Sequence, residues 1–432
     1  MSRFPRPVLH APFCSPEGFD RAFEVLEGCV IGQEHLPVGG FTRPFAAPGG
    51  LYGAGWWSLD SSLAAEGFKW VDPAFAADIV YNLAAVQRPD GRVPFWYMDA
   101  PEKAVYNVHE EIGGIPKFFE VCYHLVQRSA DDGLCRTAYT LISRNIDWWF
   151  ARRLDTATGL MTAVFEETFI PNTLTGSGEF APVDTNMELI VGCHVAAEMA
   201  DRLGLPEEAA LLRGRKAALQ ESVRRYLWDD RQRTFASLWV RTGLHEPVST
   251  ATAFMAMRYD TATPAQKAVL LSWLDDEAAY SPSGYSLPSV SRCDPRFTVV
   301  RGPYIGNPSW SGSVWTLINQ SVIRALREAG QEARAARLAW RTAEEFADNY
   351  YEFLDPTDGS GHGVVDYAWT AAQYIQIVVE EIFGVRYDGV TGTLTLDPLP
   401  TQGTMSLEGL TLPDGRTVNI TLQDGKATAK FV

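Results

Sequence analysis

The chain is poor in cysteine, in long apolar runs and in positive charge. Its six cysteines are scattered and form no Cys-x-x-Cys pair, which argues against a zinc site and a disulfide framework. No apolar run reaches the roughly 18 residues that a membrane-spanning helix needs. The segment from Met1 to Pro7 lacks the apolar stretch of a secretory leader. We therefore expect a cytoplasmic protein with no membrane partner.

Charge is unbalanced toward the acidic side. Lysine and arginine number 37 against 53 aspartates and glutamates, so the net charge is −16. Nucleic acids are bound through clustered Lys and Arg, so no nucleic-acid partner is expected. The scattered cysteines and the 7 histidines give no sign of a metal or another cofactor. The oligomeric state is left open.

Aromatic residues are plentiful. They make up 12% of the chain, with 13 Trp and 16 Tyr, within an ordinary hydrophobic fraction of 46%. Such residues can stack on sugar rings or fill a large helical core. Composition alone leaves both interpretations open.

Helical periodicity recurs along the whole chain. Met187, Val191, Val195 and Met199, for example, give one apolar stripe. The following Gly204 and Pro206 favour the end of one helix and the start of the next. Twelve helices are predicted near 18–31, 56–67, 73–87, 111–129, 134–153, 184–203, 206–228, 248–258, 264–275, 311–329, 332–353 and 366–384.

Twelve helices in pairs fit an all-α fold, an (α/α)6 barrel of six hairpins over residues 1–384. An open superhelix of repeats is the alternative. The irregular period and the long stretches 156–183 and 279–310 argue against it.

The chain changes character after about residue 385. Apolar and polar residues alternate in 393–396, 405–407 and 418–422. Asp414-Gly415 and Asp424-Gly425 are typical of tight turns between antiparallel strands. We predict a small antiparallel β appendage over residues 385–432.

Glu352 is the strongest candidate for a catalytic carboxylate. It lies between a predicted helix and the turn from Asp355 to Gly359. A lone glutamate at a helix end is usually only solvated. The segment, with Tyr367 and Trp369 downstream, resembles the general-base stretch of glycoside hydrolase families 63, 37 (trehalases) and 15. Those families place a Glu before an aromatic-x-Trp-[Thr/Ser]-x-Ala helix, so the resemblance implies that Glu352 is the base and that Trp369 lines the substrate site.

A second group surrounds Trp56, Trp57 and Asp60, followed by a loop that begins at Gln87. Asp60 near a helix start could simply be a capping residue. The group resembles the Trp-Asp-Ser helix and the Gln-x-Pro-Asp-Gly-x-Val/Ile-Pro loop of family 63 and trehalase-like enzymes. The resemblance implies that these four residues bind the sugar, although an extra Leu precedes Asp60.

Two adjacent carboxylates, Glu166 and Glu167, occur in the apolar frame Phe165 to Phe169. Apolar surroundings and a neighbouring carboxylate raise a carboxyl pKa, which suits a general acid. An exposed acidic loop is the alternative. The pair resembles the Trp-Glu-Glu acid segment of family 15 glucoamylases. The Ser-Gly-x-Asp-Asn-Ser acid motif of family 63 is absent, so the resemblance leaves Glu166 or Glu167 as the acid.

Further residues complete the predicted sugar site. Trp310 and Trp315 resemble the two Trp of the substrate-cradling Tyr-Trp-Arg-Gly-Pro-Val-Trp stretch of family 63, but Ser311 stands where that family has Arg. The alternative is that both Trp are core residues. Tyr304 lies just upstream of Trp310 and is also predicted to bind the substrate. Glu110 and Glu111 are either sugar contacts or helix caps.

Together these resemblances imply an inverting glycoside hydrolase that cleaves a small α-linked glycoside. Glu166 or Glu167 would protonate the glycosidic oxygen, and Glu352 would activate water from the opposite face. Inversion requires carboxyls roughly 6.5–9.5 Å apart. A phosphorylase or lyase on the same barrel and a non-catalytic sugar-binding protein are the alternatives. Rhamnosidases share a barrel with a β tail, but their acidic motifs are not evident.

Overall fold

The computed structural model describes residues 4–35, 41–97, 112–164, 167–169, 177–281, 285–299 and 311–432. Five predicted site residues lie outside these ranges: Glu110, Glu111, Glu166, Tyr304 and Trp310.

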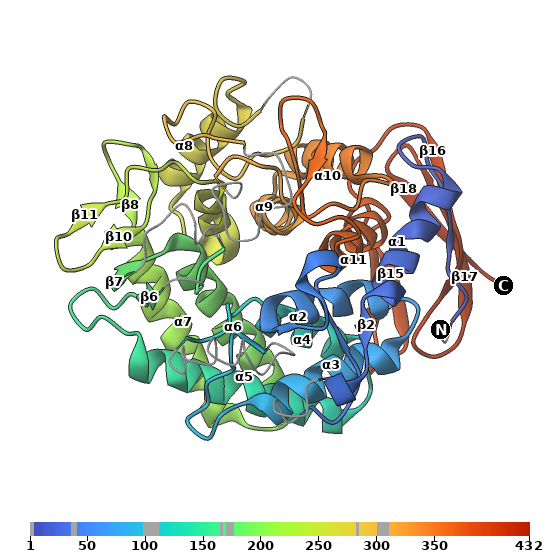
Figure 1. The fold of residues 1–432 in the computed structure, drawn as a ribbon, viewed down its shortest axis with the longest axis horizontal. Helices are drawn as coiled ribbons and strands as arrows, with labels where there is room; N and C mark the ends of the chain where they lie inside the picture. Colours follow the sequence, from blue (N-terminus) through green and yellow to red (C-terminus); the bar gives the residue numbers. More distant parts are fainter. Residues whose placement is uncertain are drawn as a thin grey trace.

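Among the described residues, six helical segments form a closed inner ring (Figure 1). They are α2 (Ser58–Phe68), α4 (Phe118–Gln127), α6 (Val183–Arg202), η5 (Ala251–Asp260), α9 (Thr316–Glu328) and α11 (Ala368–Gln376). Each segment contacts the next, and α11 returns to α2. Every residue of α2 and α11 is buried, as expected for helices covered on all sides.

In the described part of the chain, six further helices lie outside this ring. They are α1 (Pro16–Gly28), α3 (Pro73–Val86), α5 (Asp132–Arg152), α7 (Pro206–Tyr226), α8 (Pro264–Asp275) and α10 (Glu332–Phe346). Each packs on at least one inner segment, for example α1 on α11 and α10 on α9. Four of them begin with a proline at the first turn, where its missing N–H is harmless.

Most predicted helices occur, but some differ in extent or type. Residues 251–260 form a 3₁₀ segment, α4 begins only at Phe118, and α11 continues as the π-helical η7 (Ile377–Ile382). Helix α10 ends at Phe346 rather than at 353, because Asp348 adopts a left-handed conformation with φ of 56°. Glu352 therefore lies beyond the helix, directly before strand β12 (Phe353–Leu354).

The predicted strands after residue 385 are present, so a helix-rich chain with C-terminal strands is confirmed. Strands β16 (Thr404–Thr411), β17 (Thr417–Gln423) and β18 (Lys426–Phe431) pair antiparallel. Asp424 and Gly425 have φ of 47° and 76°, which suits the tight turn between β17 and β18. Strand β15 (Thr393–Leu396) instead pairs with β14 (Val385–Asp388).

The four-stranded sheet includes one strand from the other end of the chain. Strand β1 (Val8–His10) pairs with β16, with Val8 opposite Glu408. Figure 1 shows the N-terminal segment beside the C-terminal strands. The appendage is thus not made from the tail alone, and the predicted domain boundary at residue 384 stays a prediction.

Two general predictions concern the environment of the chain. Within the described ranges, no helix is long and apolar enough to cross a bilayer. All six cysteines are free thiols, and all but Cys293 are buried.

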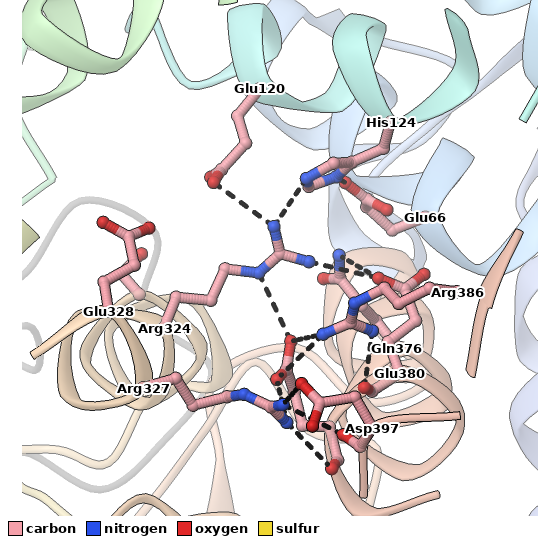
Figure 2. A network of polar contacts seen from close by, with 12 residues as sticks. Glu66, Glu120, His124, Arg324, Arg327, Glu328, Gln376, Glu380, Arg386 and Asp397 are labelled. Atoms are coloured by element: carbon pink, nitrogen blue, oxygen red, sulfur yellow. Dashed lines mark hydrogen bonds and ion pairs between the residues drawn. The ribbon is translucent and has the colours of Figure 1, made fainter. Parts of the chain in front are cut away.

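Buried ion pairs connect α2, α4, α9 and η7 (Figure 2). Arg324 of α9 lies within ion-pair distance of Glu120 (3.3 Å), Glu380 (3.1 Å) and Glu381 (3.4 Å). His124 contacts Glu66 at 2.6 Å. We call this group, with Lys69, Arg258 and Arg327, the ion-pair network.

The carboxylates of this network are held ionised. Burial alone would raise the pKa of Glu66, but Lys69 and His124 lower it below its usual range. The pKa of Glu120 is also lowered, because Arg258 and Lys117 outweigh burial. Since a buried charge without a partner costs several kcal/mol, the network is arranged so that each carboxylate faces a cation.

Candidate active site

Two buried carboxylates from distant parts of the sequence lie near each other at the opposite end of the ring. Asp60 belongs to the first turn of α2 and is 6% exposed. Glu352, just before β12, is 2% exposed. The two are linked through two tyrosines, Tyr52 and Tyr367. We call these four residues the carboxylate cluster.

Glu352 is held from two sides. The Tyr52 hydroxyl donates to Oε1 at 3.1 Å, and the Val364 amide donates to Oε2 at 3.2 Å. Gly363 has φ of 77°, and a Cβ there would lie 2.8 Å from Oε2 of Glu352. Only glycine can therefore bring the backbone this close to the carboxylate without strain.

Asp60 is oriented by the other tyrosine. The Tyr367 hydroxyl donates to Oδ1 of Asp60 at 2.7 Å. The rings of Tyr367 and Tyr52 are 5.9 Å apart, so the tyrosines connect the two carboxylates. Tyr52 comes from the glycine-rich segment 49–55. Its Gly49, at φ of 116°, packs against the carbonyl of Asp366, where a Cβ would lie 2.6 Å from the oxygen.

Both carboxylates bind protons more tightly than usual. Burial raises the pKa of Glu352 to about 8, and the negative charge of Asp60 adds to the shift. Burial also raises the pKa of Asp60 to about 7, against the hydrogen bond from Tyr367. Among the described residues, no cation contributes to either shift. The pKa of Tyr52 is raised by burial as well, so its hydroxyl stays protonated as a donor.

The two neighbouring tryptophans of β4 (Trp56–Trp57) point to opposite faces, as successive strand residues do. The Trp57 ring lies 5.0 Å from Tyr52 and 5.6 Å from Trp96, which places it beside the carboxylate cluster. The Trp56 ring, fully buried, packs in the core against Phe41 at 5.2 Å.

Trp315 and Trp369 lie beneath the cluster. Both are 1% exposed, and their rings are 5.7 Å apart. Trp315 packs on Phe353 at 4.8 Å, next to Glu352, and Trp369 packs on Tyr367 at 5.1 Å. They support the cluster residues from the core side.

Gln87 has a different environment. Its amide nitrogen donates to the carbonyls of Gly91 (2.8 Å) and Leu141 (2.9 Å). These bonds fasten the Pro-Asp-Gly loop to α5.

Glu167 is fully buried and accepts hydrogen bonds at both oxygens. Arg153 donates from Nε (2.9 Å) and from a terminal nitrogen (2.9 Å) in a forked contact. The amides of Gly113 and Val164 donate at 2.7 Å and 3.0 Å. Burial raises the pKa of Glu167, while Arg153 acts against that shift. The four donors occupy the lone pairs of both carboxylate oxygens and leave no position for a proton. These contacts therefore fit an ionised carboxylate.

The segment after Glu167 is anchored to the start of α6. The Thr185 hydroxyl donates to the Glu167 carbonyl at 2.6 Å, and the Thr168 hydroxyl donates to Asp184 at 2.9 Å. Burial raises the pKa of Asp184 to about 6. This arrangement fixes the chain directly after Glu166.

Sequence reasoning missed Tyr52 and Arg153, and it used Tyr367 only as part of a motif. Tyr52 could have been suspected, because one large polar aromatic among the glycines at 49, 50, 53 and 55 is unusual. Nothing in the sequence pairs Arg153 with Glu167. In the described part of the chain, no group of three or more His, Cys, Asp or Glu could hold a metal ion.

Comparisons with known proteins identify a matching family. A family model described as "Mannosylglycerate hydrolase MGH1-like glycoside hydrolase domain" matches residues 53–370. A mannosylglycerate hydrolase of Rubrobacter radiotolerans is 31% identical over 189 residues, which is 43% of this chain and 40% of that protein. The chain thus matches less than half the length of this relative.

Solved structures share the fold at low identity. The GH63 mannosylglycerate hydrolase of Thermus thermophilus, in complex with Tris and D-glycerate, superposes with a TM-score of 0.69 at 20% identity. The alignment covers 83% of this chain and 99% of that one. The neutral trehalase of Saccharomyces cerevisiae gives a TM-score of 0.55 at 17% identity, covering 79% and 73%. The resemblance to family 63 and trehalase-like enzymes, drawn from the motifs, is confirmed.

Proposed function

The chain belongs to the family of mannosylglycerate hydrolase-like glycoside hydrolases, and from this premise we propose that it is an inverting hydrolase of a small α-linked glycoside. The closed inner ring, with outer helices packed on it, supports an (α/α)6 barrel. The observation that carries the proposal is the carboxylate cluster. Two buried acids without a cationic partner among the described residues, oriented by tyrosines, are typical of a catalytic site.

Glu352 acts as the general base. The Tyr52 hydroxyl and the Val364 amide fix the direction of its two oxygens, so that its remaining lone pairs face the attacking water. A base is most effective when its pKa lies near the working pH. The burial that raises the pKa of Glu352 to about 8 therefore makes the ionised form a strong proton acceptor.

Asp60 binds sugar hydroxyls in the cleavage subsite, with Trp57 as an apolar platform beside it. Tyr367 holds one oxygen of Asp60, which leaves the other for the sugar. Trp56, Trp315 and Trp369 contribute by supporting the site from the core, as their burial indicates.

Glu166 is the proton donor. Its neighbour Glu167 accepts four hydrogen bonds, two of them from Arg153, and fits an anchoring anion better than an acid. The glycosidic oxygen takes the proton from Glu166 as water, deprotonated by Glu352, attacks the anomeric carbon.

The substrate is a small glycoside with an acidic aglycone. The relatives that match are mannosylglycerate hydrolases, and D-glycerate is bound in the related structure. Mannosylglycerate and glucosylglycerate are therefore the first compounds to test. The scattered free thiols fit a reducing, cytoplasmic setting.

The test is hydrolysis of α- and β-linked disaccharides and glycosylglycerates, with the first-formed anomer read by NMR. We expect release of the inverted anomer from an α-glycoside. Glu352→Gln should lower kcat by about 10²- to 10⁴-fold.

The matched control is Glu345→Gln. Glu345 is a partly buried glutamate, whose pKa burial raises to about 7, but it contacts Ser286 rather than the cluster. Its variant should keep kcat within about twofold of the wild type. Equal activity of Glu352→Gln and wild type would refute the base assignment. No hydrolysis of any glycoside would favour a phosphorylase, a lyase or a sugar-binding protein.

A further inference from the structure

A cavity lies at the end of the ring opposite the carboxylate cluster. It has a volume of about 500 Å³ and is lined by the C-terminal ends of α4 and α6 and by strands β14 and β15. Its lining carries five Lys and Arg side chains against three Asp and Glu. On a chain with a net charge of −16, this local excess of positive charge is unusual.

Arg128 is the cation of the lining for which no ion pair is found among the described residues. It follows the last residue of α4, and its guanidinium stacks on Trp70 at 3.7 Å from the ring centroid. One terminal nitrogen donates to the Lys69 carbonyl at 3.3 Å. The residue is 9% exposed. Among the described residues, no carboxylate lies within ion-pair distance of it.

The carboxylates of the lining are engaged elsewhere. Glu380 pairs with Arg324 at 3.1 Å and also with Lys69. Glu198 faces Arg213 at 3.7 Å. Asp388 accepts backbone amides within its own turn, the nearer at 2.8 Å. None of the three neutralises Arg128 directly.

An uncompensated guanidinium in this position is costly to bury. Burial lowers the pKa of Arg128 to about 10, although Glu380 and Glu66 oppose the shift from a distance. A forked guanidinium matches the geometry of carboxylate and phosphate oxygens. Arg386, which pairs with the buried Glu381 at 3.3 Å and is 38% exposed in its side chain, also lines the cavity and supplies charge nearer the surface.

We propose that this cavity binds a small oxyanion, a phosphate or a carboxylate, with Arg128 as its main ligand and Arg386 as a second cation. The site is separate from the carboxylate cluster, because Asp60 lies in the first turn of α2 whereas Lys69 follows the last residue of that helix. It does not depend on the proposed hydrolase activity.

The experiment is calorimetric titration with inorganic phosphate and, separately, with lactate, at an ionic strength held constant with chloride. We expect saturable binding of one equivalent of at least one of the two anions. Arg128→Gln should weaken that binding at least tenfold. The control is Arg136→Gln, an exposed arginine on α5 outside the cavity, which should bind as the wild type does.

The titrations with phosphate and with lactate distinguish two classes of ligand. Binding of phosphate alone indicates a phosphorylated ligand, and binding of lactate alone indicates a carboxylic acid. No saturable binding of either anion, or equal weakening by Arg128→Gln and Arg136→Gln, overturns the proposal.

Arg128 also closes the end of α4, so its variant has to be checked for folding by thermal melting. If Arg128→Gln does not fold, Arg386→Gln decides the question. At least threefold weaker binding in that variant supports the site, and unchanged binding overturns it.

Discussion

The two ends of the inner ring treat buried acids in opposite ways. Helix α2 carries an example of each, with Asp60 in its first turn and Glu66 near its end. Both are almost fully buried. The pKa of Asp60 is raised to about 7, whereas that of Glu66 is lowered. The difference lies in the partners, since Asp60 has a tyrosine hydroxyl and Glu66 has a lysine and a histidine.

Helix polarity does not explain this contrast. The N-terminal end of a helix favours a negative charge by about 0.3–1 kcal/mol, which should benefit Asp60. A shift of one pKa unit corresponds to about 1.4 kcal/mol, so a shift of about three units exceeds the dipole effect. Burial decides the protonation of Asp60, and the neighbouring cations decide that of Glu66. One end of the ring is thereby kept reactive and the other stable.

The largest effect is expected from removing a cation of the ion-pair network. Arg324→Met would leave Glu120, Glu380 and Glu381 with one cation fewer. Because uncompensated buried charge is strongly unfavourable, we expect a loss of about 3–5 kcal/mol of unfolding free energy. Urea unfolding at pH 7 measures it.

The control for this variant is Arg341→Met, which removes a surface pair with Glu344. Both partners are nearly half exposed, so the change should stay within about 0.5 kcal/mol. Similar losses in the two variants would mean that the network contributes no more than surface pairs.

At the end of the ring that holds the carboxylate cluster, removing a charged group should raise the free energy of unfolding. In wild type, the unfolded chain releases the Asp60 proton near pH 4, while the folded chain keeps it until about pH 7. Stability due to this group is therefore full below pH 4 and is lost as the pH rises to 7. Asp60→Asn removes that loss, and should be more stable than wild type by about 2–4 kcal/mol at pH 8 but not at pH 4.

The same variant tests the coupling of the two carboxylates. The charge of Asp60 raises the pKa of Glu352, so the residual kcat/KM of Asp60→Asn should begin to rise at lower pH than in wild type. Thermal melts and pH–rate profiles measure the two effects. A stability difference that does not vary with pH would contradict the raised pKa of Asp60.

The smallest effect is expected from Tyr367→Phe, which removes the hydrogen bond to Asp60. Loss of one buried hydrogen bond costs about 1 kcal/mol. We expect an increase in KM of several-fold with a smaller change in kcat, because Asp60 would be less well oriented toward the sugar. The control is Tyr351→Phe, because Tyr351 is partly buried and lies next to Glu352 in the sequence. A KM equal to that of wild type in Tyr367→Phe would argue against Asp60 as a sugar ligand.

Much of this contrast could be predicted at the catalytic end. Glu352 and Asp60 could be identified because each is embedded in a local motif. Tyr52 and Arg153 were missed, since the contact of Tyr52 with Glu352 spans 300 positions and no local pattern encodes it. The predicted helix over 332–353 extends beyond the end of α10 at Phe346. The left-handed Asp348 ends the helix, and the sequence does not distinguish it from a helical aspartate.

The ion-pair network was invisible for a related reason. Glu66, Glu120 and Glu380 each occur in a helix where an acid is unremarkable, and only the closure of the ring brings them to shared cations. Sequence patterns report which face of a helix is buried, but not which residue of another helix it meets.

The pairing of Val8 with Glu408, together with the return of α11 to α2, has a consequence for how the chain matures. Both contacts join segments whose synthesis on the ribosome is separated by most of the chain. The first hairpins must wait, with apolar surface exposed, until the last ones are translated. High contact order slows folding, so the final closing step is where chaperone binding and aggregation should compete during production of this protein.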